Sequence, residues 1–422
     1  MWASPSLADQ LRPGSASRVL VAVTAIALLA ACDARVQLVE PRASAAPPVV
    51  LTLVASDTAL AQRAGWSPGI PGTTVFIRRD QDPTILSLTS DDRGVLSLPD
   101  LPAASYWVWA EKLPSGWERE APVLAPAAMG GGRRVALGTE PAQVLQLRGQ
   151  GNGSLVISEF YYHAPPTSVV PDAAYQYHNY IELYNNSDTT IFLDGKIVGA
   201  GFNYSIDAAL WPCVETAPFR NDPRGIWSQE FQAFPGTGHD YPLAPGRTAV
   251  IAEQAIDHSA LFPGLPDLSH ANFQFSWPGR AQNPAVPTML PVQLRASPAQ
   301  IMFLELMDAP FVSEPVNVAA LERRQGRYTG GDEALFPKGA ILDVAALYSV
   351  FYLVPRSAPV CGTLVDTSLD ALAAFVNPDG IGSDDHMLSA QRKLLPDGRH
   401  LQRTGTSAAD WTIGPRSPGK VP

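Results

Sequence analysis

The sequence is poor in the residues that most often hold metals or bind nucleotides. It has three cysteines, Cys32, Cys213 and Cys361, and seven scattered histidines in 422 residues. An HExxH pair, the Cys and His spacing of a zinc site, and a phosphate-binding glycine loop followed by Lys-Ser/Thr are all missing. These absences argue against a zinc enzyme and a nucleotide-binding protein, and we expect neither a cofactor nor a metal.

Basic clusters and long helical periodicity are also scarce. Lys and Arg number 30 against 40 Asp and Glu, which gives a formal net charge of −10. Phosphate backbones are bound by clustered Lys and Arg, so the composition argues against nucleic acid as a partner. The chain has 40 prolines and 33 glycines but is 46% hydrophobic, which indicates a loop-rich β protein with a packed core.

Long apolar runs are limited to Val19–Ala31, which follows Arg12 and Arg18 and ends at Leu29–Cys32. The run is short for a membrane span, and a charged region, an apolar run and small residues in that order form a secretory signal. The Leu-Ala-Ala-Cys ending resembles a bacterial lipobox. We therefore expect residues 1–31 to be a lipoprotein signal peptide and a lipid on Cys32 to anchor the protein at the bacterial cell envelope. The alternative is an ordinary signal peptide with a chance cysteine.

Residues 32–48 predict a Pro/Ala-rich tether, and residues 49–148 predict a first β domain. Leu86–Leu98 is interpreted as a hairpin around an Asp/Gly turn, and Met129–Arg134 as a flexible turn. The order of strands and turns resembles a carboxypeptidase-regulatory-like, or transthyretin-like, β-sandwich. Such domains are spacers or accessory modules, so the resemblance implies no catalytic residue here.

Three strand-like runs follow one another between residues 154 and 195: Leu155–Tyr162, Asn179–Asn185 and Thr190–Asp194. The second run alternates. Ile181 and Leu183 share one face, which we expect to be core, and Tyr180, Glu182 and Tyr184 share the other.

These runs carry a second resemblance, read from ISEFYY and YIELYNNSDTTIFLDG. The stretch is similar to the opening of a lamin-tail-type domain, and more closely to uncharacterised bacterial lipoproteins of the DUF4876 type. Leu243–Gly246, Ile341–Asp343 and Ser417–Gly419 agree in order, so the resemblance covers residues 153–422. It implies an all-β fold of two sandwiches, transthyretin-like and then lamin-tail-like (immunoglobulin-like), the second with long loop insertions such as Ser205–Tyr241. It also implies an envelope location. It gives no activity to expect, because none is established for the family.

Two glutamates in the expected strands, Glu159 and Glu182, could act as an acid and a base if they faced a cleft. We favour a structural role, in which loop backbone or an arginine such as Arg392 pairs them, because buried charge needs partners. His178, near Glu182, and His386, beside two aspartates, could each contribute to a zinc or calcium site. The ligand spacing is missing at both, and we favour surface turns or polar pairs.

Aromatic residues gather in and around the insertions, where they could form a binding surface or pack loops onto sheets. The sequence leaves both open for Tyr161, Tyr162, Tyr175, Tyr177, Tyr180, Trp211, Phe219, Trp227, Phe231 and Phe234. If these residues form a binding surface, its anchors would be Trp211 and Trp227, because tryptophan is enriched at energetic hot spots. With Cys32 lipidated, Cys213 and Cys361 remain, and either a disulfide or two free thiols fits an oxidising compartment.

These features predict a non-enzymatic binding or scaffolding protein of the cell envelope. Its partner would be an outer-membrane uptake system, another envelope protein or a glycan. The alternatives are a glycan-active or other hydrolase with its site in the insertion loops, and a purely structural envelope protein.

The lipid anchor gives the first testable prediction. Cys32→Ser should release the protein from the membrane fraction or leave it as an unprocessed precursor, because serine offers no thiol for the lipid. Metabolic labelling with a clickable fatty acid measures this directly. Label retained on the variant would contradict the anchor at Cys32.

Overall fold

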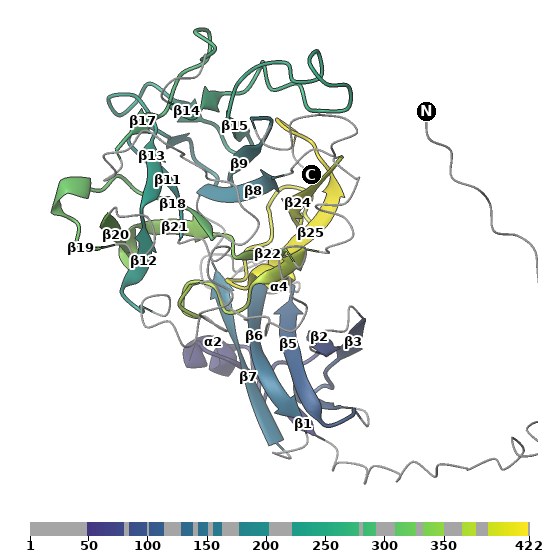
Figure 1. The fold of residues 1–422 in the computed structure, drawn as a ribbon. Coiled ribbons are helices and arrows are strands. Elements are labelled where there is room, and N and C mark those ends of the chain that lie inside the picture. Colours follow the sequence, from purple (N-terminus) through teal and green to yellow (C-terminus); the bar gives the residue numbers. More distant parts are fainter. Residues whose placement is uncertain are drawn as a thin grey trace, which may run out of the picture. The chain divides into compact units, whose positions relative to one another are not determined.

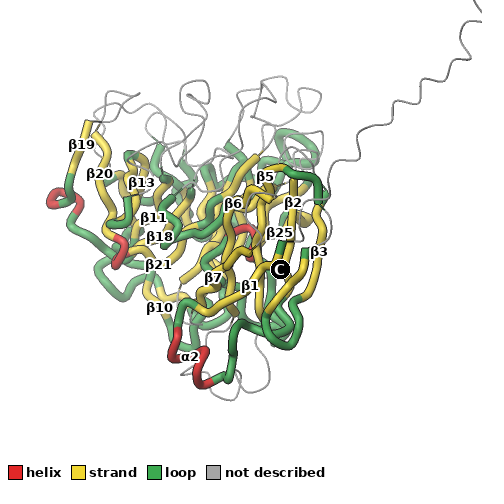
Figure 2. Tube along the Cα trace, turned by 90° about the horizontal axis from the view of Figure 1, so that it is seen from below, coloured by secondary structure: helices red, strands yellow, loops and turns green. Residues whose placement is uncertain are grey.

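Strands dominate the computed structural model, and its helices are few and short (Figure 2), so the all-β expectation is confirmed. The structure describes residues 49–79, 84–98, 101–113, 128–137, 142–150, 155–162, 177–201, 222–277, 282–292, 309–325, 332–349, 365–376 and 387–420. Pro47–Pro422 forms one compact unit. Within the described residues, no helix is long and apolar enough to cross a membrane.

Several residues singled out from the sequence lie outside this description. They are Cys32, Tyr175, Trp211, Cys213, Phe219, Cys361 and His386. The lipid anchor, the disulfide and the anchoring role of Trp211 therefore stay predictions.

The first part of the chain builds a sheet of seven strands in the order β3-β2-β5-β6-β7-β1-β4 (Figure 1). The strands are β1 (Val50–Ala55), β2 (Thr74–Arg79), β3 (Ile85–Thr89), β4 (Val95–Ser97), β5 (Ala104–Lys112), β6 (Ala128–Leu137) and β7 (Ala142–Gln150), with helix α2 (Thr58–Arg63) after β1. Strand β6 pairs with β5 along its whole length but with β7 only over its first three residues. The strands on either side of this short pairing, β3-β2-β5-β6 and β7-β1-β4, share one core. It takes Leu51 and Leu53 from β1 and Val75 and Ile77 from β2.

The hairpin expected over Leu86–Leu98 is wrong. Strand β3 pairs with β2 and β4 pairs with β1, so the two lie at opposite edges of the sheet. The turn between them does form: Asp91 accepts hydrogen bonds from the backbone N–H groups of Arg93 and Val95, and Gly94 has a φ of 70°. A turn signal sets a local reversal of the chain, but the core that each strand joins decides which strands pair.

The flexible turn expected at Met129–Arg134 is also wrong, because these residues lie inside strand β6. A Cβ atom on Gly130 would lie 2.3 Å from Thr404 Oγ1, and one on Gly132 would lie 2.7 Å from Leu372 Cβ. The glycines therefore allow segments near the end of the chain to pack directly on the first sheet.

The later part of the chain forms two facing sheets with a shared core. One has six strands in the order β16-β15-β9-β8-β24-β25, and the other has five in the order β17-β13-β11-β18-β21. The core takes Ile157, Ile181 and Ile251 from the six-stranded sheet and Val198 and Val312 from the five-stranded one. The bounds are β8 (Leu155–Tyr161), β9 (Tyr180–Asn185), β11 (Ile197–Ala200), β13 (Glu230–Ala233), β15 (Thr248–Ala252), β16 (Phe273–Gln274), β17 (Leu290–Pro291), β18 (Pro310–Ser313), β21 (Ile341–Val344), β24 (Leu388–Arg392) and β25 (Trp411–Pro415).

Further layers cover the outer faces of this sandwich. A three-stranded sheet in the order β12-β20-β19 packs against the five-stranded sheet through a second core. The alternation expected in β9 is confirmed: Ile181 and Leu183 lie in the sandwich core, while Tyr180 and Tyr184 point to other clusters. The remaining elements are β10 (Ile191–Phe192), β12 (Gly225–Ser228), β14 (Pro242–Leu243), η2 (Val318–Ala320), β19 (Arg323–Gln325), β20 (Asp332–Pro337), η3 (Lys338–Ala340), β22 (Leu347–Ser349), β23 (Ala374–Val376) and α4 (Ser407–Asp410).

The close packing on β6 predicts the effect of adding a single methyl group. Gly130→Ala should lower the free energy of unfolding by about 1–3 kcal/mol, because Thr404 has to move to admit it. Gly339→Ala is the matched control, because nothing lies within 4 Å of its Cβ position and its φ is not positive. Urea unfolding of both variants measures the difference. Equal stability of the two would contradict the packing described for β6.

Candidate functional site

Glu159 and Glu182 are direct cross-strand partners on β8 and β9, and both are fully buried. The Glu159 carboxylate accepts hydrogen bonds from Tyr180 Oη at 2.6 Å, Ser389 Oγ at 2.6 Å, and the backbone N–H and hydroxyl of Ser417 at 2.8 and 3.0 Å. Glu182 accepts from Ser158 Oγ at 2.8 Å and from the Gly419 backbone N–H at 2.6 Å. The expected loop-backbone partners are confirmed, and they come from the C-terminal strap, which we define as Ser417–Gly419.

The suggested arginine partner is wrong, because Arg392 binds other acids. Its Nη2 donates to Asp343 at 2.6 Å, its Nη1 lies 3.3 Å from Asp410 Oδ2, and its Nε donates to the Ile157 carbonyl at 2.8 Å. Arg392 is 1% exposed. It therefore joins β24 and β8 to Asp343 and Asp410 across the interior.

Burial raises the pKa of Glu182 to about 8; the Ser158 hydrogen bond acts against this shift and the charge of Glu159 adds to it. A raised pKa is common in catalytic acids, but a catalytic acid also has to reach its substrate. Both carboxylates are 0% exposed and bound to the strap. Their arrangement supports a structural role, in which they hold the end of the chain against the six-stranded sheet.

A polar cavity of about 160 Å³ lies beside Arg392, lined by Asp343, Asp370, Asp410 and Arg403 among others. Burial raises the pKa of Asp370 to about 7, opposed by its hydrogen bonds with Ser407, and burial raises that of Asp410 to about 6, opposed by the charge of Arg392. Most of these charges already pair with one another or with backbone. The cavity thus belongs to the buried network that closes the sandwich.

His178 is buried, with its ring centroid 6.2 Å from that of His258 and 5.7 Å from that of Tyr161. It does lie in a turn, but its side chain is buried among aromatic rings and is not at the surface, as the sequence had suggested. In the described part of the chain, no group of three or more His, Cys, Asp or Glu side chains is placed to hold a metal ion.

Trp227 was one of two candidate anchors if the aromatic residues form a binding surface, and its burial fits the alternative, in which they pack loops onto sheets. It is 7% exposed, its indole N–H donates to Asp222 at 3.0 Å, and the Arg324 guanidinium lies 4.4 Å from its ring centroid. Other aromatic residues of the expected surface are buried too: Tyr161, Tyr162, Tyr180, Phe231 and Phe234. Among the described residues, these rings therefore pack layers together.

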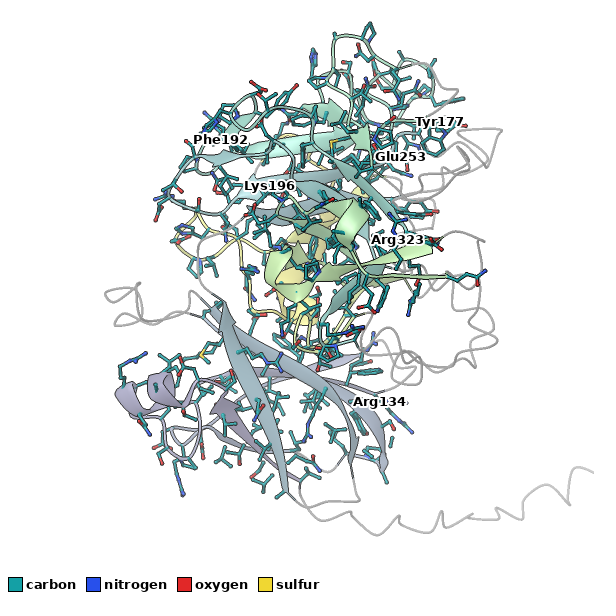
Figure 3. The ribbon with its side chains drawn as sticks, turned by 90° about the vertical axis from the view of Figure 1, so that its left-hand side faces the viewer. Arg134, Tyr177, Phe192, Lys196, Glu253 and Arg323 are labelled. Carbon is teal, nitrogen blue, oxygen red and sulfur yellow. The ribbon has the colours of Figure 1, made fainter. Side chains whose placement is uncertain are left out.

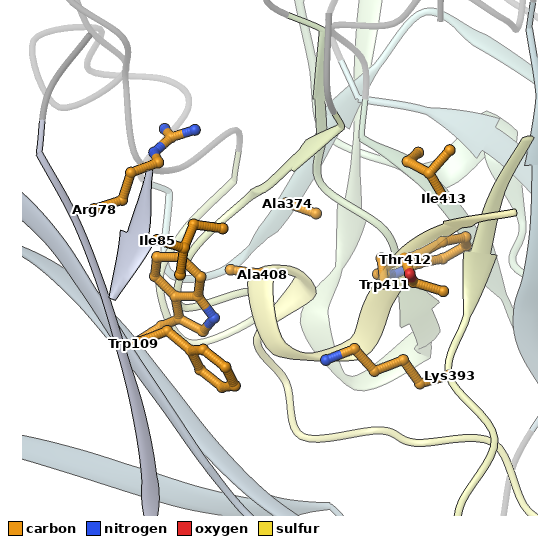
Figure 4. A pocket seen from close by; sticks show the side chains of 10 residues that line it. Arg78, Ile85, Trp109, Ala374, Lys393, Ala408, Trp411, Thr412 and Ile413 are labelled. Carbon is orange, nitrogen blue, oxygen red and sulfur yellow. The ribbon is translucent and has the colours of Figure 1, made fainter. Parts of the chain in front are cut away.

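A different set of aromatic rings lines a pocket of about 240 Å³, which we call the aromatic pocket (Figure 4). One wall is the outer face of the first sheet. Phe76 and Arg78 on β2 alternate with the core residues Val75 and Ile77, so they point away from that core. Trp109 on β5 is the cross-strand partner of Phe76, and the rings stack with centroids 5.5 Å apart and an angle of 18°.

The same face of the sheet carries other apolar and cationic groups. Ile85 on β3 pairs with Arg78, lines the pocket and is 52% exposed. Trp107, next to Trp109 on this face, packs against Leu372 and lies beneath the Arg134 guanidinium, whose carbon is 5.2 Å from the ring centroid. Arg134 is labelled on β6 in Figure 3.

The second wall comes from the C-terminal part of the chain, where Trp411, Thr412 and Ile413 of β25 are joined by Ala408 of α4 and by Lys393. Figure 4 shows the Lys393 side chain reaching across toward Trp109 from below α4. Its ammonium lies 5.9 Å from the Phe76 ring centroid and 3.4 Å from Glu111 Oε2. Exposed Ile85 and Thr412 leave the pocket open to solvent.

The lining of the aromatic pocket is chemically suited to binding a flat apolar group. The residues described in its lining supply ring faces, aliphatic groups and two cations, but neither a carboxylate nor a histidine. Ring faces and aliphatic groups bind flat apolar surfaces, and the few polar groups of such a pocket orient the ligand.

One further sequence motif, a GxSxG pattern, has to be judged by the structure around it. Gly65–Gly69 reads Gly-Trp-Ser-Pro-Gly and fits the GxSxG pattern of α/β-hydrolases. In those enzymes the serine sits between a strand and a following helix. Here Ser67 is exposed in a loop that follows α2 and leads to β2. This segment therefore lacks the structure that activates such a serine.

Sequence reasoning missed the aromatic pocket, although part of its signal was present. Trp107 and Trp109 flank the core residue Val108, and a period of two places both indoles on the outer face of a strand. The partner wall lies about 300 residues later in the chain, around Trp411, and local patterns do not predict that contact.

The chain was compared with known proteins. No protein-family model matches it, and no curated protein matches it either. A solved structure that is similar is the crystal structure of a DUF4876 family protein from Bacteroides thetaiotaomicron VPI-5482. It has 19% sequence identity and a TM-score of 0.49, and the match covers 89% of this chain and 98% of that chain. At these values the similarity says nothing about the function of this chain.

Because Glu182 is buried, we predict that Glu182→Gln raises the free energy of unfolding by an amount that depends on pH. Because the folded pKa is raised from 4.5 to about 8, the contribution of Glu182 to stability is fully present below pH 4.5 and is lost as the pH rises through 8. Glutamine avoids that loss. Its amide fits the site, because Ser158 Oγ also lies 3.2 Å from the Glu182 carbonyl oxygen and can donate there instead.

Urea unfolding of both proteins at about pH 5 and about pH 9 tests this. The variant should match the wild type at the lower pH and exceed it at the higher pH by a few kcal/mol, at about 1.4 kcal/mol per pKa unit. A difference that is the same at both pH values would contradict the raised pKa of Glu182.

Proposed function

We propose that this protein is a non-enzymatic binding protein of the bacterial cell envelope, held at a membrane by a lipid on Cys32. The observation that carries the proposal is the aromatic pocket, in which rings from β2, β5 and β25 meet two cationic side chains. Its volume of about 240 Å³ is below the roughly 300–1,000 Å³ of pockets for drug-sized ligands, so it suits a small ligand, or one ring of a larger partner such as an envelope protein or a glycan.

Two features favour binding over hydrolysis. The carboxylate pair that could have acted as acid and base is buried and hydrogen-bonded to neighbouring side chains and to the strap. The aromatic pocket, by contrast, opens to solvent but offers neither a carboxylate nor a histidine among its described lining residues. A partner in an outer-membrane uptake system agrees with a ligand-binding lipoprotein, and it belongs to the same proposal.

The position of Thr412 allows the pocket to be blocked with little damage to the fold. Thr412 is an exposed strand residue in the pocket lining, so a tryptophan there should fill the cavity from the solvent side. Val144 is the matched control, because it is also an exposed strand residue, 51% exposed, and does not line the pocket.

Titration with the neutral fluorescent probe N-phenyl-1-naphthylamine tests the proposed function. The wild type and Val144→Trp should show one saturable site, and Thr412→Trp should weaken binding by about tenfold or more, a loss of about 1.4 kcal/mol. Thermal unfolding checks that both variants fold. Lack of saturable binding, or equal binding by a folded Thr412→Trp, would contradict the pocket as the binding site.

A further inference from the structure

We infer that the aromatic pocket selects a small organic anion that carries a flat apolar ring. This inference rests on the proposed function and adds the chemical class of the ligand. It has two parts, a stacking surface for the ring and a cationic position for the acidic group.

The stacking surface is already organised. Phe76 and Trp109 are cross-strand partners and stack on each other, so their positions are set by the pairing of β2 with β5. Trp411 stands on the opposite wall, 5% exposed. Rings fixed by sheet structure lose little conformational freedom when a ligand ring packs against them.

The cationic position comes from Lys393. The Lys393 backbone is pinned on both sides: its N–H donates to the Asp410 carbonyl at 2.8 Å, and its carbonyl accepts from the Gln402 N–H at 2.7 Å. The ammonium is therefore directed over the Phe76 ring, where its side chain remains 32% exposed. Arg78 lines the pocket from β2.

The charge around the pocket favours an anion despite the net charge of −10 of the whole chain. Both charged side chains among the described lining residues are cationic. Glu111 lies 3.4 Å from the Lys393 ammonium, but its same oxygen also accepts from Gln402 Nε2 at 2.8 Å. A second anion on the pocket side of Lys393 would form a charge-assisted hydrogen bond in a partly buried place, where such bonds are strong.

A matched pair of probes separates the two parts of the inference. N-Phenyl-1-naphthylamine and its 8-sulfonate, 1-anilinonaphthalene-8-sulfonate, share one ring system and differ in a single anionic group. At low salt the wild type should bind the sulfonate about tenfold more tightly than the neutral probe. High salt should weaken the binding of the sulfonate but not that of the neutral probe.

Lys393→Gln should bring the two dissociation constants together, because it should weaken binding of the sulfonate about tenfold more than binding of the neutral probe. Lys420→Gln is the control, because it removes the same charge from an exposed residue outside the pocket lining. Equal affinity of the wild type for both probes, or a preference for the sulfonate that survives Lys393→Gln, would overturn the anionic class and leave the proposed function standing. If neither probe binds in a way that Thr412→Trp blocks, the proposed function fails with it.

Discussion

A carboxyl group buried between strands needs hydrogen-bond partners inside the protein, and here those partners come from the end of the chain. Glu159 and Glu182 lie on the central strands of the six-stranded sheet and are bound by the strap. Arg392 joins β8 to Asp343 and Asp410. Removing one partner of such a set leaves an unpaired buried charge, which typically costs about 3–5 kcal/mol. The sandwich therefore depends on its C-terminal residues being in place.

This constraint also places the second wall of the aromatic pocket. Trp411 follows Asp410, which accepts from Arg392, and the Arg392 guanidinium carbon lies 4.9 Å from the Trp411 ring centroid. Lys393 follows Arg392 directly. The glycines of β6 let Thr404 and Leu372 approach the first sheet closely, so the outer face of that sheet meets this wall. The interactions that close the fold thus also assemble the site.

The sequence allowed the all-β class and the strands β8 and β9 to be predicted, because alternating residues and turn signals act locally. It also indicated that Glu159 and Glu182 would need backbone partners. The predictions from sequence were wrong where long-range packing determines the structure. Gly130 and Gly132 look flexible in sequence, but they lie in a strand and let other segments pack closely against it. Leu86–Leu98 contains a turn, but its two strands do not pair as a hairpin. Trp227 shows the same limit, since the burial of a ring depends on layers built elsewhere.

The aromatic pocket as a site for ring-bearing anions is the central claim, and a crystal structure of the protein soaked with 1-anilinonaphthalene-8-sulfonate would test it most directly. The ring system should lie between Trp109 and Trp411, with the sulfonate next to the Lys393 ammonium. A structure in which the probe binds elsewhere and this pocket stays empty would contradict the claim.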